Sequence, residues 1–164
     1  MLLEMRVFGL AIDPVTNAPI VVLKDTEDKN TLPIWIGILE ASAIATELEK
    51  IKLARPMTHD LLKEILKTLA VTVSRVEVND LRGNVYYATI HLSMDDRHYA
   101  LDARPSDAIA LALRTDSSIF VDEKVLEKSK NIDLRKGGDK GKEGDSWLDI
   151  LENLSPEDFG KYKM

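Results

Sequence analysis

Cysteine is absent from the 164 residues of this chain. Its absence excludes a disulfide framework, a thiolate nucleophile and a cysteine-bound metal, and it suits a reducing compartment. No apolar run is long enough to span a bilayer. Residues 1–10 lack the basic region and small-residue cleavage site of a secretory signal. We therefore expect a cytoplasmic protein with no membrane segment.

An excess of positive charge is also missing, since the formal net charge is −6 and the isoelectric point is near 5.1. This balance argues against nucleic-acid binding through overall charge, although a local basic groove stays open. The sequence contains no His-Glu-x-x-His zinc motif, phosphate-binding glycine loop, Gly-x-Ser-x-Gly elbow or dinucleotide fingerprint. Several common enzyme classes are thereby excluded.

Hydrophobic periodicity divides the chain into short strands and helices. Alternating or β-branched runs predict strands at 5–12, 20–25, 31–37, 71–78, 85–94, 99–103 and 118–122. The alternation shifts near Ser74 and Arg75, which indicates a bulge. Helical spacing predicts helices at 38–53, from Thr58 to about Leu69, at 106–116 and at 123–129.

The two halves of this pattern match each other. Ala43-Ile44-Ala45 aligns with Ala108-Ile109-Ala110, an offset of 65 (108 minus 43), and the same shift superposes the three preceding strands. We therefore expect an α/β fold (α+β-like) with two β-β-β-α units forming a mixed sheet packed by helices. The helix that begins at Thr58 joins the units. The junctions at 37–42 and 102–107 should occupy equivalent places.

The C-terminal part of the chain has a different composition. Residues 135–146 contain four glycines and mixed charge but no apolar residue, which predicts a flexible linker after a domain at 1–134. Residues 147–164 then form an amphipathic helical tail, with Trp147, Ile150, Leu151 and Leu154 on one face. Two alternatives stay open for it: docking on its own core, or binding a partner chain as a helix in a groove.

Two helices begin with the same signature, "RPMTHD" (55–60) and "RPSD" (104–107). Thr58 and Ser106 are good helix N-caps. Asp60 and Asp107 follow in the first turn, where the helix dipole favours carboxylates. Ordinary helix starts therefore account for these four residues.

Arg55 and Arg104 are not explained in this way, because a cation is unfavourable beside the positive end of a helix dipole. A structural interpretation pairs each arginine with a nearby carboxylate (Glu40, Asp60, Asp102 or Asp107). A functional interpretation has both arginines bind phosphate together with the helix N-termini.

The same junctions carry residues suited to metal-assisted hydrolysis. Glu40, Asp60 and Asp107 supply oxygen ligands of the kind that hold Mg²⁺ or Mn²⁺. Such an ion assists phosphodiester cleavage by activating water and stabilising the leaving oxygen. His59 could act as the general base. The grouping depends on the fold bringing these residues together.

Three segments, "LPIWIGILEA" (32–41), "RPMTHDLL" (55–62) and "RPSDAIALALR" (104–114), resemble the bifunctional nuclease domain family. The resemblance spans about residues 5–133 and implies an α/β fold, cleavage of both DNA and RNA, and homo-oligomers. The positions that match the family motifs are Glu40, Arg55, His59, Asp60, Arg104, Ser106 and Asp107.

We accordingly expect a nuclease that hydrolyses phosphodiester bonds with a divalent metal. Its catalytic residues would be His59, Asp60 and Asp107, its phosphate-binding residues Arg55 and Arg104, and its metal ligands Glu40, Asp60 and Asp107. The alternative is a non-catalytic oligomeric binding or regulatory module whose C-terminal helix docks a protein partner.

Overall fold

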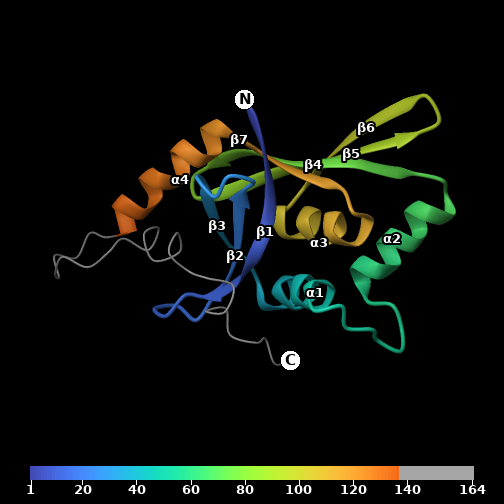
Figure 1. Cartoon of the computed structure of the whole chain (residues 1–164), viewed down its shortest axis with the longest axis horizontal. Helices are drawn as coiled ribbons and strands as arrows, with labels where there is room; N and C mark the ends of the chain where they lie inside the picture. Colours follow the sequence, from blue (N-terminus) through green and yellow to red (C-terminus); the bar gives the residue numbers. More distant parts are fainter. Residues whose placement is uncertain (137–164) are drawn as a thin grey trace.

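The computed structural model describes residues 1–136, with side chains described through residue 131 (Figure 1). Its elements in chain order are β1 (Leu2–Ile12), β2 (Pro19–Asp25), β3 (Thr31–Trp35), α1 (Ile38–Leu48), α2 (Thr58–Thr68), β4 (Thr72–Arg82), β5 (Val85–Met94), β6 (Arg97–Ala103), α3 (Pro105–Thr115), β7 (Ser118–Asp122) and α4 (Glu123–Lys136). No helix among the described residues is long and apolar enough to cross a membrane.

All the strands within residues 1–136 join one seven-stranded mixed sheet, in the order β3-β2-β1-β7-β4-β5-β6. The first three strands form an antiparallel meander, and so do β4, β5 and β6. Between the two meanders, β7 runs antiparallel to β1 and parallel to β4. The predicted α/β fold with two β-β-β-α units is therefore confirmed, with β7 between the two halves. The predicted bulge is also present, as a register shift between Val73 and Arg75.

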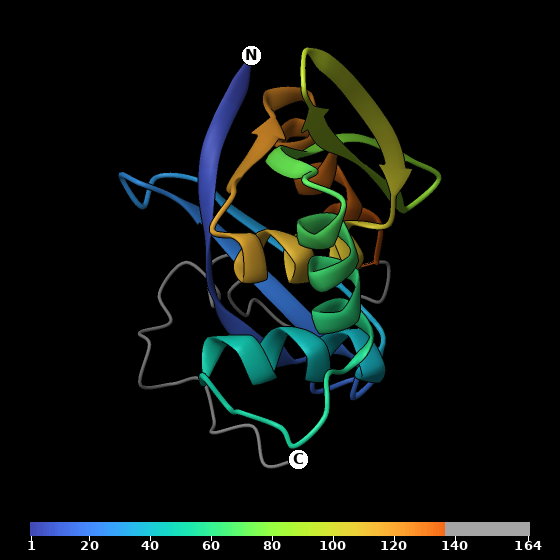
Figure 2. The same ribbon diagram turned by 90° about the vertical axis from the view of Figure 1, so that its right-hand side faces the viewer.

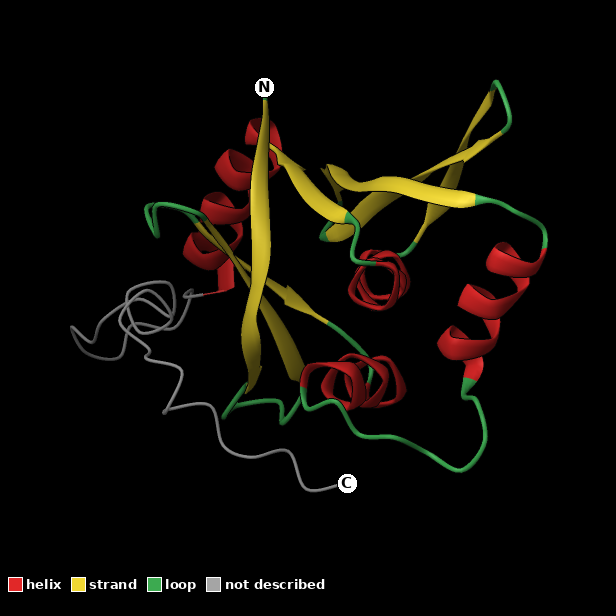
Figure 3. Cartoon of the chain, turned by 45° about the vertical axis from the view of Figure 1, so that its right-hand side comes forward, coloured by secondary structure: helices red, strands yellow, loops and turns green. Residues whose placement is uncertain are grey.

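The core lies between the sheet and α3. Every residue of β2 is buried: the apolar run 19–23 belongs to the core, and the charged Lys24 and Asp25 that follow it are buried as well. Residues 108–112 of α3 are all buried, and the helix packs against both α1 and the strands β4 and β5. Figure 3 shows α3 beneath these strands, with α1 on its far side. The edge strand β6 is almost wholly exposed, and the β5–β6 hairpin projects from the body.

Helix α2 is attached differently from its neighbours. It runs across α1 and α3 at the surface (Figure 2), contacts α3, and contains no buried residue. Leu66, which is partly buried, packs against the core. The helix therefore lies on the body rather than within it.

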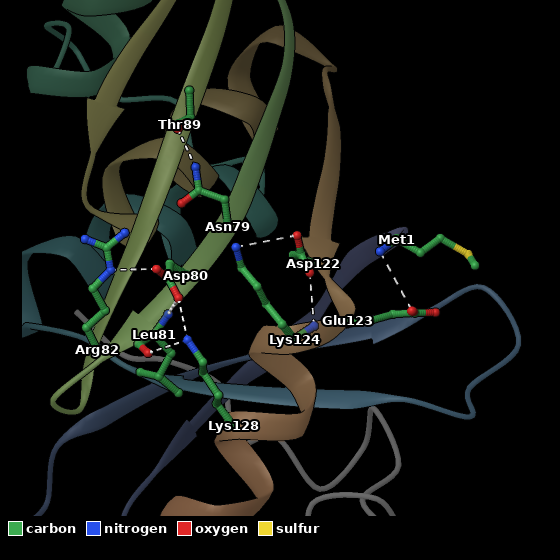
Figure 4. Close-up of polar contacts among 10 residues, drawn as sticks. All are labelled: Met1, Asn79, Asp80, Leu81, Arg82, Thr89, Asp122, Glu123, Lys124 and Lys128. Atoms are coloured by element: carbon green, nitrogen blue, oxygen red, sulfur yellow. Dashed lines mark hydrogen bonds and ion pairs between the residues drawn. The ribbon is translucent and has the colours of Figure 1, made fainter.

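Helix α4 packs on β4, β7 and β3 through the buried side chains of Val125 and Leu126. Polar contacts between α4 and β4 lie beside the packing of Val125 and Leu126 (Figure 4). Lys128 Nζ donates to Asp80 Oδ1 (2.7 Å) and to the Leu81 carbonyl (3.3 Å), while Arg82 Nε donates to Asp80 Oδ2 (2.6 Å). Hydrogen bonds from Lys128 and Arg82 hold the pKa of Asp80 far below its usual range.

Some predicted boundaries were wrong. The helix expected at 38–53 ends at Leu48, because Lys50 takes a left-handed φ of 53° and the Ile51 N–H bonds back to the Thr46 carbonyl (3.0 Å). The strand expected to end at 78 continues to Arg82. Helix α4 runs to Lys136, and the rest of the predicted linker (135–146) and the whole tail (147–164) lie outside the described residues.

Candidate functional site

The site begins where the first turns of α1 and α3 meet. Glu40 lies in the first turn of α1, and its Oε1 is 3.0 Å from Arg104 Nη1 at the start of α3. The two strand-to-helix junctions, which the offset of 65 makes equivalent in the two halves, are in contact in the structure. The residues that the sequence places in equivalent positions form one surface region.

The predicted N-caps Thr58 and Ser106 are not at the cap positions. Met57 and Arg104 occupy these positions, in extended conformation. Pro105 at the first helical position disfavours helical geometry for Arg104, which places the cap at the arginine itself. In α2, the Met57 N–H donates to Asp60 Oδ2 (3.0 Å), so the first-turn carboxylate satisfies the amide of the cap residue.

Arg104 is held by two carboxylates. Its Nε donates to Asp107 Oδ2 (2.9 Å), and its Nη1 pairs with Glu40 Oε1. Asp107, followed by Glu40, raises the pKa of this already strongly basic group. The side chain is still 67% exposed. Arg104 therefore forms ion pairs with nearby carboxylates, as the structural interpretation predicts. Its guanidinium is nevertheless exposed to solvent.

His59 connects the two helix starts. Its Nε2 lies 3.0 Å from Asp107 Oδ1, across 48 residues of sequence. The His59 side chain is 13% exposed and that of Asp107 is 32% exposed. Asp107 thus pairs with His59 through Oδ1 and with Arg104 through Oδ2. When the Nε2–H of His59 donates to Asp107, the ring's Nδ1 is its basic nitrogen.

Asp60 binds a residue to which we assigned no role from the sequence. Arg114 Nε donates to Asp60 Oδ1 (2.7 Å), and the Arg114 side chain is 2% exposed. Its other nitrogens donate to the Ala110 carbonyl (3.0 Å) and the Ala43 carbonyl (2.9 Å), so one guanidinium joins α1, α2 and α3. Hydrogen bonding from Arg114 holds the pKa of Asp60 below its ordinary value.

Arg114 could have been found from the sequence. It closes the apolar run "AIALAL" (108–113), and a cation directly after so apolar a run needs a polar partner once the helix is packed in the core. The choice of Asp60 as that partner requires the tertiary fold, since 54 residues separate them.

Arg55 is the predicted phosphate-binding residue that does not join this group. It is exposed in the segment between α1 and α2, and it makes no ion pair with any residue in the described part of the chain. Arg55 and Arg104 are therefore not in equivalent surroundings, although the Arg-Pro sequences that contain them are alike.

A pocket of about 760 Å³ lies beside these residues, between α1 and α2. His59, Asp107, Arg104 and Glu40 contribute polar groups to its wall. Leu39, Ala43, Leu53, Met57 and Leu62 are among the apolar residues that complete it. A concave apolar site with a few convergent polar groups is the usual form of a binding site for a small molecule.

Comparison with known proteins assigns this arrangement to a family. The model of the bifunctional nuclease domain matches residues 21–133, a segment that contains the pocket and every residue paired around it. The chain belongs to the bifunctional nuclease domain family. The resemblance noted from the sequence motifs is thereby confirmed.

Relatives of the bifunctional nuclease domain differ in how much of this chain they share. An uncharacterized protein of Mycobacterium tuberculosis (strain H37Rv) is 33% identical over 162 residues, covering 95% of this chain and 97% of the relative. Bifunctional nuclease 1 of Arabidopsis thaliana is 30% identical over 125 residues, covering 73% of this chain and 38% of the plant protein. Bifunctional nuclease 1 of Oryza sativa subsp. japonica is 28% identical over 110 residues, covering 64% of this chain and 33% of the relative.

The carboxylates of this bifunctional nuclease domain do not fit the metal site expected from the sequence. Glu40 and Asp107 pair with Arg104, and Asp60 pairs with Arg114. Through residue 131, no group of three or more His, Asp or Glu side chains is arranged to hold a metal ion. An arginine pairs with one oxygen of each carboxylate: Arg104 with Glu40 Oε1 and Asp107 Oδ2, and Arg114 with Asp60 Oδ1. Metal dependence stays a prediction for experiment.

Proposed function

We propose that this protein is a nuclease that hydrolyses phosphodiester bonds of DNA and RNA. The observation that carries the proposal is the His59–Asp107 pair in the wall of a pocket, within a chain of the bifunctional nuclease domain family. The names of the rice and Arabidopsis relatives support the same activity, over about a third of their length. The cytoplasm is the proposed location, in keeping with the cysteine-free composition.

The chemistry follows from the hydrogen bond that orients His59. Asp107 holds the ring with Nε2 as the donor, so Nδ1 accepts a proton from an attacking water. The water oxygen forms a new bond to phosphorus while the bond to one sugar oxygen breaks. The sugar oxygen leaves as a hydroxyl after taking a proton from solvent. Asp107 also stabilises the positive charge that His59 gains.

Arg104 is placed to bind the phosphate. Its Nε and Nη1 are occupied by Asp107 and Glu40, which fix the plane of the guanidinium. Nη2 of this exposed side chain supplies the donors for a phosphate oxygen. Asp60 has a different role in this proposal, because its pairing with Arg114 makes it a residue that positions α2 and hence His59.

The decisive experiment is cleavage of end-labelled single- and double-stranded DNA and of RNA by the purified protein, with Mg²⁺, with Mn²⁺ and with EDTA. His59→Gln and Asp107→Asn should each lower the rate by about 100-fold or more, as loss of a general base or its orienting group does. His98→Gln is the matched control, since His98 is exposed on β6. Cleavage that is equal in wild type and His59→Gln would point to a contaminant.

A second candidate function is a non-catalytic binding module. The specific observation in its favour is the apolar pocket lining, which includes Leu39, Leu53, Met57 and Leu62. In this case the site would hold an apolar group of a ligand, and the tail at 147–164 would bind a protein partner. Absence of cleavage under every metal condition, with a folded protein, would favour this candidate.

A further inference from the structure

Cations without a carboxylate partner are concentrated on one short part of the chain. Among residues 1–131, six exposed lysine and arginine side chains form no ion pair: Lys52, Arg55, Lys63, Lys67, Arg97 and Lys130. Four of the six fall within residues 52–67, which comprise the end of the segment between α1 and α2 and most of α2 itself (Figure 2). The other exposed cations of the described part pair with carboxylates, so these four leave an uncompensated positive charge around α2.

This part of the surface is positive although the chain as a whole is negative. Residues 52–67 carry four cations and two carboxylates, and one of these carboxylates, Asp60, is paired with Arg114. Glu64 is therefore left to offset the four cations, which gives a free charge of +3 (4 minus 1) against −6 for the whole chain. A local excess of this kind attracts polyanions even when the net charge repels them. It is the local basic region that the overall charge left open.

The four cations lie on both sides of His59 along the chain. Lys52 and Arg55 precede it, in the segment that leads into α2. Lys63 and Lys67 follow it at intervals of four residues, so the three side chains share one stripe of the helix, about 6 Å apart along its axis. The unpaired charge thus surrounds the residue that is proposed to activate water.

Lys63 and Lys67 also line a hollow of their own. A pocket of about 410 Å³ lies between α2, the start of β4 and the end of α3. Leu66, Val71 and Val73 are among the residues that line it with the two lysines. Cations beside apolar groups suit a nucleic-acid strand, because its phosphates are anionic and its bases present flat faces of low polarity.

We propose that these four cations bind the phosphates that flank the scissile phosphate, so that a nucleic-acid strand lies along α2. The scissile phosphate is at Arg104, beside His59, and the flanking phosphates meet the cations before the helix on one side and those on the helix on the other. Arg55 thereby has a phosphate-binding role, although for a different phosphate from the one at Arg104.

The length of α2 fixes the size of the substrate. The helix has 11 residues and is therefore about 16 Å long. At the B-form rise of about 3.4 Å per nucleotide, four or five phosphates of one strand would lie beside it. This inference rests on the proposed nuclease function, and it deepens it: the substrate is a strand of several nucleotides rather than a small phosphodiester.

The first test counts the phosphates that the protein contacts. Binding of a labelled single strand of about 12 nucleotides is followed by fluorescence anisotropy in EDTA, at increasing concentrations of NaCl. The logarithm of the binding constant falls with the logarithm of the salt concentration, with a slope of about −0.7 for each phosphate neutralised. Lys63→Gln together with Lys67→Gln should therefore make the slope shallower by about 1.4. Lys52→Gln together with Arg55→Gln should have the same effect.

The matched control is Arg97→Gln together with Lys130→Gln. It removes the same charge from two exposed side chains that also form no ion pair, and the slope should stay at the wild-type value. An equal change of slope in the control would show that overall charge governs binding and would overturn the proposal, as would a wild type that binds no strand at low salt. Glu64→Gln should tighten binding, because it removes the carboxylate next to the lysine stripe, while Glu127→Gln on α4 should not.

A small substrate separates this inference from the proposed activity. Bis(4-nitrophenyl) phosphate has one phosphodiester and no flanking phosphate. Lys63→Gln together with Lys67→Gln should raise KM for a polynucleotide several-fold, with kcat and the hydrolysis of the small diester unchanged, whereas His59→Gln should abolish both reactions. Cleavage with an unchanged KM and salt slope in the lysine variant would overturn the strand-binding surface and leave the nuclease function. A shallower slope in a protein that cleaves neither substrate would overturn the nuclease function and leave the strand-binding surface.

Discussion

The guanidinium of Arg114 lies 2.7 Å from the carboxylate of Asp60, with the arginine 2% exposed and the aspartate 35% exposed. This ion pair, together with the bonds from Arg114 to the Ala43 and Ala110 carbonyls, joins the three helices that surround the pocket. Since α2 has no buried residue, the pair is a main reason that His59 stands beside Asp107.

We expect Arg114→Met to destabilise the fold by about 3–5 kcal/mol, because it leaves two carbonyls and a carboxylate without their shared donor. Arg114→Lys should cost less, since it keeps the charge but loses the planar geometry. The free energy of unfolding in denaturant measures both. Arg97→Met, at the exposed start of β6, is the control and should be nearly neutral. An equally small effect of Arg114→Met would mean that the pair contributes little.

Asp60 should make stability depend on acid. Its pKa is lowered in the folded protein from an ordinary value of 3.8, mainly by the hydrogen bond from Arg114. A lowered folded-state pKa gives stability that is fully present above the unfolded value and is lost as the pH falls through the folded value. The advantage of the wild type over Asp60→Asn should therefore be constant near neutral pH and decrease below about pH 4. Unfolding free energies measured between neutral and acid pH test this, and a constant difference throughout would contradict it.

Two substitutions on α4 separate apolar from ionic stabilisation. Leu126 is 5% exposed, so Leu126→Ala should cost about 2–5 kcal/mol. Lys128 pairs with Asp80 at the surface, and Lys128→Met should cost less than about 1 kcal/mol. Denaturant unfolding of both variants gives the comparison. A larger loss from Lys128→Met would show that the charged group, rather than the apolar contact, holds α4.

Filling the pocket should affect activity without affecting the fold. Ser42 lies on the α1 wall of the pocket, and Ser42→Phe would occupy space that a substrate needs. We expect kcat/KM for nucleic-acid cleavage to fall by about tenfold or more while the unfolding free energy changes by less than about 1 kcal/mol. Glu49→Phe, just after α1 and outside the pocket lining, is the control. Unchanged cleavage by Ser42→Phe would place the reaction elsewhere.

The fold was largely predictable because its elements are short and carry local signals. Alternation in 85–94 and the continuous apolar run in 20–23 are properties of neighbouring residues, and so are the helix starts at the two Arg-Pro sequences. The end of α1 was predicted too late because its stop is a left-handed Lys50, a residue type without a preference for that conformation.

The order of strands and helices along the chain and the duplication were thus determined by the sequence. Which carboxylate meets which cation was decided by the tertiary structure. His59 and Asp107 are 48 residues apart, and Asp60 and Arg114 are 54 apart, so no local pattern relates them. The crossing of α2 over α3 brings them within hydrogen-bonding distance. The same crossing leaves Leu61, Ile65 and Leu69 of α2 exposed, while Leu66 packs against the core.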